Sequence, residues 1–544
     1  MINNTSLKCS TKLLMAVSLS IGLGTSTTLA SADERESLEQ LKATTTNLID
    51  LLVQEGVLPK DKADAMMKKA SQDAAQQVKQ AKAREAADGE STAQTNIAPD
   101  DKSVRVQYVP EHVKKEMRDE IQKEVMTKLN YKAGTRLGLP SWIDRIAFNG
   151  DIRLRYENDS FSSNNAPVAA LNNTVRNANI SNSTEDRNRF RVRARLGADL
   201  EVNDWLKGGL RLTTGTLTDP VSPNQTEEVN KGKYTVGLDR AYLAASPLPW
   251  LSVKGGRFSN PFLHTDLVWD PDLALDGVAA TFTPKFNDSW SSFTTVGAFP
   301  IEEIQSSEVN DAKDKWLYAL QTGIKWQAEN RSTAKLGIAY YDYKNVEGQS
   351  NLTGLDSFSG TVPAFRQKGN NTFDINSLNG GLPGSNNIAL ASQFELINVT
   401  GQIDLLTFDP VHVTLTGDYV KNIGFDEKEI FKRTGIDYKE ENEGYQVRLD
   451  VGHNSFNGGA NVEVKPNDWQ VSLAYKRLEA DAVLDAFTDS DFHLGGTDAK
   501  GWLVGGNYAI DKNAWVGARY FSADAISGPP LSIDVLLIDF IAKF

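Results

Sequence analysis

Arginine side chains recur at every second position in one part of this 544-residue sequence. Arg191, Arg193 and Arg195 alternate with apolar residues, and 12 of the 23 arginines lie between residues 145 and 257. That region has a net charge of about +4, whereas the whole chain has a formal net charge of -13. Because a guanidinium group stays charged and presents a planar fork of donors, such a row could bind carboxylate or phosphate groups.

Residues that could perform enzymatic chemistry are few. Five histidines occur, and none of them lies in a nucleophile, zinc-protease, phosphate-loop or dinucleotide motif. His412 falls alone on a polar face, where a pore-lining role suits it better than that of a catalytic base. The pairs Asp489 with Asp491 and Asp311 with Asp314 are either oxygen ligands for Ca²⁺ or solvated loop charges. We therefore predict no catalytic residue, cofactor or metal ligand, and no enzymatic activity.

Strands must position the arginines, because apolar residues recur with a period of two from about residue 145 to the end. Tyr445, Val447 and Leu449, for example, alternate with Gln446 and Arg448. About sixteen such segments can be counted. They begin near Arg145, Arg187, Asp204, Thr235, Pro249, Leu273, Ser289, Lys315, Ser332, Gln393, Val411, Glu443, Asn467, Lys500, Lys512 and Ser532.

The connections between these segments alternate in length. Residues 158–186 and 345–392 are long, whereas 202–204 and 407–410 are tight. An even number of strands with short turns at one end and long loops at the other is typical of a bacterial outer-membrane barrel. A mean hydropathy of -0.39 argues against a polytopic helical membrane protein but not against a barrel. We predict an all-β transmembrane barrel of about 16 antiparallel strands over residues 145–544, in the outer membrane of a Gram-negative bacterium.

The tryptophans indicate where the barrel would meet the membrane interface. Seven of the ten lie at the strand ends next to the short turns, as an aromatic girdle would. Two of these seven, Trp205 and Trp515, share the parity of their polar neighbours and could instead cap the rim. The seven are Trp142, Trp205, Trp250, Trp290, Trp326, Trp469 and Trp515.

Two further features assign the faces of the strands. Leu536, Ile538 and Phe540 share the face of the C-terminal Phe544, similar to the terminal strand signal that barrel-assembly machinery reads. The alternating arginines lie on the face of the strand opposite to that of their apolar neighbours. Each Arg at the bilayer midplane would cost roughly 2–4 kcal/mol on the lipid side. The arginine row must therefore line the interior.

The N-terminus is typical of a secretory signal peptide over residues 1–32. Lys8 and Lys12 precede an apolar stretch, and small residues lead to a cleavage position after Ala32. A retained membrane anchor is the alternative, but the apolar stretch is too short to span a bilayer. The only cysteine, Cys9, would leave with the signal.

A helical, coiled-coil-like region is predicted over residues 33–88, followed by a linker over 89–109 and an amphipathic helix over 110–130. Leu38, Leu41 and Leu48 form a narrow apolar seam in the first of these regions. The last helix is either a solvated spacer or a specific binding helix. We expect this part of the chain to lie in the periplasm.

Four segments resemble the putative porin family of Gram-negative outer membranes. They are LLVQEGVL at 51–58, YVPEHVK at 108–114, GRFSNPF followed by DLVWD within 256–270, and EADAV through FTDSD at 479–491. The resemblance covers nearly the whole mature chain. It implies an outer-membrane pore, and it brings no catalytic motif.

In general porins, which the predicted barrel resembles, the loop after the fifth strand folds into the bore. Here that loop is 259–271, and its apolar side chains would be costly in water, so we expect it to pack inside the wall. Its acids, Asp266 and Asp270, would then face the arginine row and impose a transverse field on passing solutes. The candidate pore-lining and constriction residues are Arg153, Arg155, Arg191, Arg193, Arg195, Arg211, Asp266, Trp269 and Asp270.

Two interpretations of the arginine row remain open. It is either the basic half of a constriction or a structural wall paired with acids such as Asp151, Asp199 and Glu201. The predicted function is a water-filled diffusion channel for small hydrophilic solutes, selected by bore and wall charge. The alternatives are a receptor or adhesin that acts through the long loops, and a barrel-embedded hydrolase.

The expected partners are outer-membrane lipid, small hydrophilic solutes, and barrel-assembly machinery through Phe544. Further copies of the chain are expected too, because the resemblance to general porins implies a trimer. The acidic net charge argues against nucleic acid.

We expect the helical region to assemble the protein, because its narrow apolar seam is too small to bury alone. Crosslinking of the mature chain and of a variant lacking residues 33–130 tests this expectation. Deletion should abolish the crosslinked oligomers. Identical patterns would show that the barrel wall mediates assembly instead.

Overall fold

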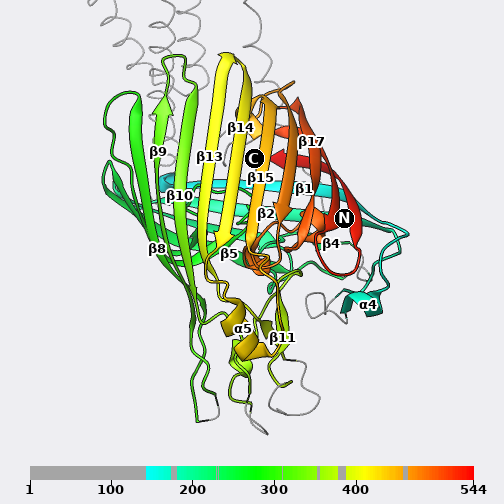
Figure 1. Ribbon diagram of the computed structural model, residues 1–544. Helices are drawn as coiled ribbons and strands as arrows, with labels where there is room; N and C mark the ends of the chain where they lie inside the picture. Colours follow the sequence, from blue (N-terminus) through cyan, green and yellow to red (C-terminus); the bar gives the residue numbers. More distant parts are fainter. Residues whose placement is uncertain are drawn as a thin grey trace, which may run out of the picture. The chain divides into compact units, whose positions relative to one another are not determined.

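Sixteen antiparallel strands form a closed barrel in the computed structural model of the protein (Figure 1). The structure describes residues 143–172, 180–227, 230, 232–308, 310–351, 356–377, 387–456 and 463–544. The predicted signal peptide, helical regions and linker over residues 1–130 lie outside the described residues. The predicted barrel fold is confirmed, and every predicted strand start lies within two residues of the observed one.

The barrel strands run in sequence order around the wall. They are β1 (Ile146–Phe161), β2 (Arg187–Glu201), β3 (Leu206–Thr214), β5 (Val236–Leu248), β6 (Leu251–Ser259), β7 (Ala274–Phe282), β8 (Trp290–Glu302), β9 (Lys315–Gln327), β10 (Thr333–Lys344), β13 (Glu395–Phe408), β14 (Val411–Asn422), β15 (Glu443–Gly452), β16 (Trp469–Leu478), β17 (Ala499–Asp511), β18 (Ala514–Ala525) and β19 (Ser532–Lys543). Each strand pairs with the next, and β1 pairs with both β2 and β19, so the wall has no free edge.

Short elements in the connections were not predicted. The two-residue strand β4 (Gln225–Thr226) pairs with β2, while β11 (Thr372–Asp374) and β12 (Ile388–Leu390) form a separate ladder. The helices are α4 (Val168–Asn172) and α5 (Glu427–Thr434), with 3₁₀ turns at Ile143–Arg145, Ser359–Thr361, Asn454–Phe456, Asp485–Phe487 and Phe492–Leu494. Among the described residues, no helix is long and apolar enough to cross a membrane.

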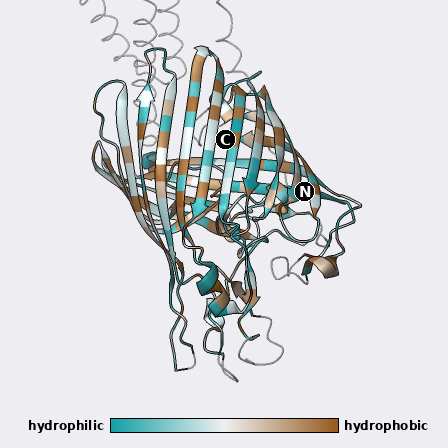
Figure 2. Cartoon of the chain, in the orientation of Figure 1, coloured by the Kyte–Doolittle hydropathy of each residue, from teal (hydrophilic) through white to brown (hydrophobic). Residues whose placement is uncertain are grey.

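The strands carry one apolar and one polar face, visible as alternating bands in Figure 2. On β15, Tyr445, Val447 and Leu449 are exposed on the outside, whereas Gln446 and Asp450 are buried inside. A period of two places successive side chains on opposite faces of the wall, so the sequence alternation translates directly into a lipid face and a bore face.

Most members of the predicted aromatic girdle have exposed side chains. Trp205, Trp250, Trp290, Trp326 and Trp469 are exposed beside the short turns, and Trp142 lies outside the described residues. The exception is Trp515, which packs inside with Val464 and Ala509. Its parity, shared with polar neighbours, leaves a position outside the girdle open, and the structure places Trp515 outside the girdle.

A pair of neighbouring positions on β13 tests the assignment of faces. Ile403 is exposed on the outer face, whereas Gln402 lines the bore. Ile403→Arg should lower the free energy of unfolding by about 1 kcal/mol, because the charge would meet lipid near the level of Trp326 rather than at the bilayer midplane. Gln402→Arg should change it much less. Urea unfolding in lipid vesicles measures both, and equal losses would contradict the assignment.

Candidate functional site

The arginine row faces the bore. Arg153 and Arg155 on β1 lie directly opposite Arg193 and Arg191 on β2 in the strand register. Arg153, Arg155 and Arg193 are buried, and Arg155 is only 2% exposed. Like charges opposite each other on neighbouring strands repel, so this arrangement requires compensating carboxylates.

Carboxylates on the same wall supply part of this compensation. Asp151 accepts hydrogen bonds from Arg193 at 2.8 Å and from Arg195 at 2.6 Å. Asp539 on β19 binds Arg155 through both of its oxygens, at 2.7 and 3.0 Å. The arginine row therefore pairs with acids of the wall. This agrees, for Asp151, with the interpretation of the row as a structural wall.

The other two expected wall acids do not pair with the row. Asp199 accepts a hydrogen bond from Asn149, and Glu201 pairs with Lys207 near the short turns. Both lie too far along the strand toward the turn to reach the arginines. Arg211 pairs with Asp239 on the neighbouring β5. It lines neither of the two cavities in the bore that are described below.

The loop between β6 and β7, residues 260–273, packs against the inside of the wall, as its apolar residues predicted. Phe262, Leu267 and Trp269 are buried, and the Trp269 ring lies 5.2 Å from that of Tyr341 on β10. Gln321 on β9 bonds to both the amide and the carbonyl of Leu263. Apolar packing and wall hydrogen bonds together hold this loop in the bore.

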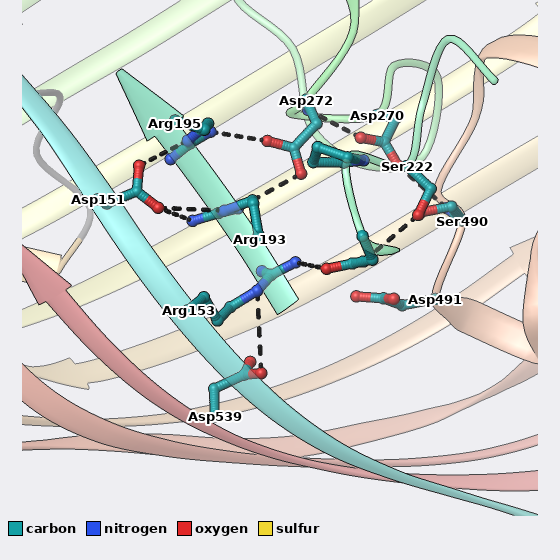
Figure 3. A network of polar contacts seen from close by, with 12 residues as sticks. Asp151, Arg153, Arg193, Arg195, Ser222, Asp270, Asp272, Ser490, Asp491 and Asp539 are labelled. Atoms are coloured by element: carbon teal, nitrogen blue, oxygen red, sulfur yellow. Dashed lines mark hydrogen bonds and ion pairs between the residues drawn. The ribbon is translucent and has the colours of Figure 1, made fainter. Parts of the chain in front are cut away.

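The acid of this loop that meets the arginine row is Asp272, which is not among the predicted constriction residues (Figure 3). Asp272 lies 3.6 Å from Arg193 and 3.0 Å from Arg195. The prediction that Asp266 and Asp270 face the row is wrong. Asp266 instead accepts a hydrogen bond from Gln446 at 2.6 Å and pairs with Lys476 at 3.4 Å.

The charge states of these loop acids differ. Burial disfavours the charged form of Asp272, but Arg193 and Arg195 outweigh it and hold its pKa at about 2. Burial, together with the neighbouring charges of Asp272 and Asp489, raises the pKa of Asp270 well above its ordinary value. Asp272 is therefore the anionic partner of the row, whereas burial and the neighbouring negative charges disfavour the charged form of Asp270.

A second loop, residues 479–498 between β16 and β17, also enters the bore. Its Asp491 pairs with Arg155 at 3.0 Å and with Arg519 at 2.8 Å. These guanidinium groups outweigh the effect of burial and lower the pKa of Asp491. Asp489 pairs with Lys476 at 2.9 Å. Asp489 and Asp491 are thus bound by cations, and neither the calcium interpretation nor the solvated one describes them.

The two inward loops are bonded to each other. The Asp270 amide donates to the Phe487 carbonyl at 2.8 Å, and the Ser490 amide donates to the Asp270 carboxylate at 3.1 Å. Asn370 from the long loop 345–394 donates to the carbonyl of Val483 at 2.8 Å. These loops together form a plug in the bore. The sequence predicted only the contribution of the loop between β6 and β7. The apolar residues of 479–498 are the signal that could have revealed the second loop.

Among the described residues, two large cavities in the bore lie on either side of the plug. The outer cavity, near the long loops, has a volume of about 430 Å³ and is lined by Arg187, Arg189 and Arg191. The inner cavity has a volume of about 970 Å³ and is lined by Arg153, Arg193 and Arg195, as well as by Trp269. Ser490 and Asp491 line both cavities. The arginine row therefore runs past the plug from one cavity to the other.

The polar site that the sequence singled out around His412 has a carboxylate partner. No group of three or more His, Cys, Asp or Glu residues in the described part of the chain is placed to hold a metal ion. His412 was expected to stand alone on its face, but its Nδ1 lies 3.0 Å from Asp404 across the β13–β14 pair. Thr414 donates to the same carboxylate. The pair fixes the Asp404 side chain beside the inner cavity.

The barrel and its charged bore agree with the family to which the chain belongs. A family model described as "Putative porin" matches residues 42–544, so the protein is a member of that family. No curated protein sequence matches the chain significantly.

Several solved outer-membrane structures are similar to the chain at low identity. OprB of Pseudomonas putida at high pH gives a TM-score of 0.42 and 12% identity, covering 76% of this chain and 97% of its own. The outer membrane channel DcaP of Acinetobacter baumannii gives 0.37 and 10%, covering 73% and 97%. OmpF of Salmonella typhi, in complex with daunomycin, gives 0.38 and 10%, covering 73% and 97%. At TM-scores below 0.5 these structures support no conclusion about function.

Lys476 joins both inward loops to the wall, because it pairs with Asp266 and with Asp489. Lys476→Gln would leave the buried Asp489 and the partly buried Asp266 without this cation, so unfolding should become easier by about 3 kcal/mol. The single-channel conductance should rise as the loops leave the bore. The exposed pair of Lys421 with Glu443 provides the control, and Lys421→Gln should alter neither quantity. An unchanged conductance in Lys476→Gln would show that the loops are held by apolar packing alone.

Proposed function

We propose that the protein is an outer-membrane diffusion channel for small hydrophilic solutes, in which the arginine row governs the passage of anions. The observation that carries this proposal is that the row continues from the outer cavity to the inner cavity past the plug. Fixed guanidinium charges in a narrow, protein-walled path attract anions, and they keep their charge at any physiological pH. Selection would arise from bore and wall charge, without chemistry or a cofactor.

The acids of the plug would supply the negative charges opposite the arginine row, and the two together would produce a transverse electric field across the bore. Asp272 and Asp491 each lie within ion-pair distance of arginines on the wall. An anion that passes the plug would exchange places with these carboxylates one contact at a time. This exchange lowers the free energy that the anion needs to dissociate from each arginine. Rapid passage through a channel requires such weak binding at each site.

The surroundings of the channel follow from the family and from the outer face. A belt of exposed apolar and aromatic side chains supports contact with outer-membrane lipid. Assembly as a trimer, recognition of the C-terminal strand by barrel-assembly machinery, export by a signal peptide and a periplasmic location for residues 33–130 are parts of the same proposal. The alternative role as a receptor or adhesin is less favoured, because loop 345–394 buries Asn370 and Asn371 within the plug.

Reversal potentials in a salt gradient test the role of the row. Replacing Arg191, Arg193 and Arg195 by Gln should shift the zero-current potential of the channel toward cation preference. Asp272→Asn should shift it the other way, because this carboxylate is the anionic partner of the row. Asp270→Asn should have less effect, because Asp270 is bonded to the amides of Asp272 and Ser490 rather than to an arginine of the row. If neither the arginine nor the Asp272 substitution moves the potential beyond error, the row is structural.

A further inference from the structure

Two lysines face each other on the wall of the inner cavity. Lys325 on β9 and Lys335 on β10 are direct partners in the strand register, and both line the cavity of about 970 Å³. Like charges directly opposite on neighbouring strands destabilise a sheet. Such a pair is unfavourable unless something compensates for its repulsion.

Carboxylates offset the repulsion between the opposed arginines of β1 and β2. Arg153 and Arg193 lie opposite each other, and carboxylates of Asp151, Asp272 and Asp539 lie within ion-pair distance of one or the other. The lysine pair differs. No carboxylate among the described residues forms an ion pair with either ammonium group.

Two wall acids that line the same cavity, Asp404 and Asp450, have other partners. Asp404 is held by His412 and by Thr414, both at 3.0 Å. Asp450 pairs with Arg448 at 2.9 Å. These carboxylates therefore have their own donors. Asp404 acts on Lys335 electrostatically but forms no ion pair with it, so the lysine ammonium groups remain available to a solute in the cavity.

Further donors continue the row of the lysine pair. Gln402 on β13, Thr416 on β14 and Arg448 on β15 are successive register partners of Lys335, and each lines the same cavity. The row thus presents two ammonium groups, an amide, a hydroxyl and the part of the Arg448 guanidinium that is not bonded to Asp450 and Ser472, at one level of the wall. Donors of this kind match the oxygen atoms of carboxylates and phosphates.

We propose that Lys325 and Lys335 form a binding site for the oxyanion of a small carboxylate or phosphate solute inside the bore. The site rests on the proposed channel function, which it deepens by naming the class of solute. β9 and β10 lie half-way around the strand order from β1 and β2. An anion that leaves the arginine row would therefore meet a second cationic contact across the inner cavity, and its own charge would relieve the repulsion between the lysines.

Block of chloride current through the purified channel tests the site, with inorganic phosphate and succinate as probes at constant ionic strength. Lys325→Gln and Lys335→Gln should each raise the half-blocking concentration by about tenfold. Lys254→Gln is the matched control, because Lys254 lies on β6 and does not line the inner cavity. It should change the value by less than about twofold, since a distant charge is screened by salt. Whichever probe blocks at the lower concentration identifies the preferred source of the oxyanion.

A further variant separates binding from stability. Lys325→Glu places opposite charges across the β9–β10 pair, so the thermal unfolding temperature should rise while phosphate and succinate no longer block. Equal effects of Lys335→Gln and Lys254→Gln would overturn the proposal, because a general loss of charge would explain them. A lower unfolding temperature in Lys325→Glu would also contradict it, since the lysines would then have an unrecognised stabilising role.

Thermal unfolding with added phosphate or succinate gives a readout that needs no current. A ligand bound to the folded barrel should raise the unfolding temperature of the wild-type protein and of Lys254→Gln, but not of Lys335→Gln. If the protein carries no current and this shift is present, the channel function fails while the site stands. If it carries current and shows neither block nor shift, the site fails while the channel function stands.

Discussion

Fixed positive charge on the barrel wall is the constraint on which the arrangement of the bore depends. Guanidinium groups remain charged when buried, and the strand register places Arg153 directly opposite Arg193. Buried like charges at this spacing require carboxylates between them. The wall supplies Asp151, and the two inward loops supply Asp272 and Asp491. The loops are therefore held in the bore by charge as well as by apolar packing.

The strands and their faces could be predicted from the sequence because one physical contrast governs both. Each strand meets lipid on one side and water or protein on the other, so a period of two persists in the residue types. This contrast was sufficient for the sixteen strands and for the inward orientation of Arg191, Arg193 and Arg195. The apolar residues of loop 260–273 similarly revealed its burial, since they could not remain in water.

Which charges meet inside the bore could not be predicted in the same way. Asp266, Asp270 and Asp272 lie within a few residues of one another, and the backbone path of the loop decides which carboxylate turns to the arginines. The pairing of Asp491 with Arg155 joins residues far apart in the sequence, so no local spacing records it. The opposed lysines, Lys325 and Lys335, likewise become visible only once the register of β9 and β10 is known.

The current carried by the purified wild-type protein across a planar lipid bilayer under a KCl gradient tests the central claim most directly. A bore whose wall charge steers anions past a charged plug predicts discrete conductance steps and a reversal potential of the sign given by chloride preference. The absence of current from correctly folded barrel, or a reversal potential of the sign given by potassium preference, would contradict the account.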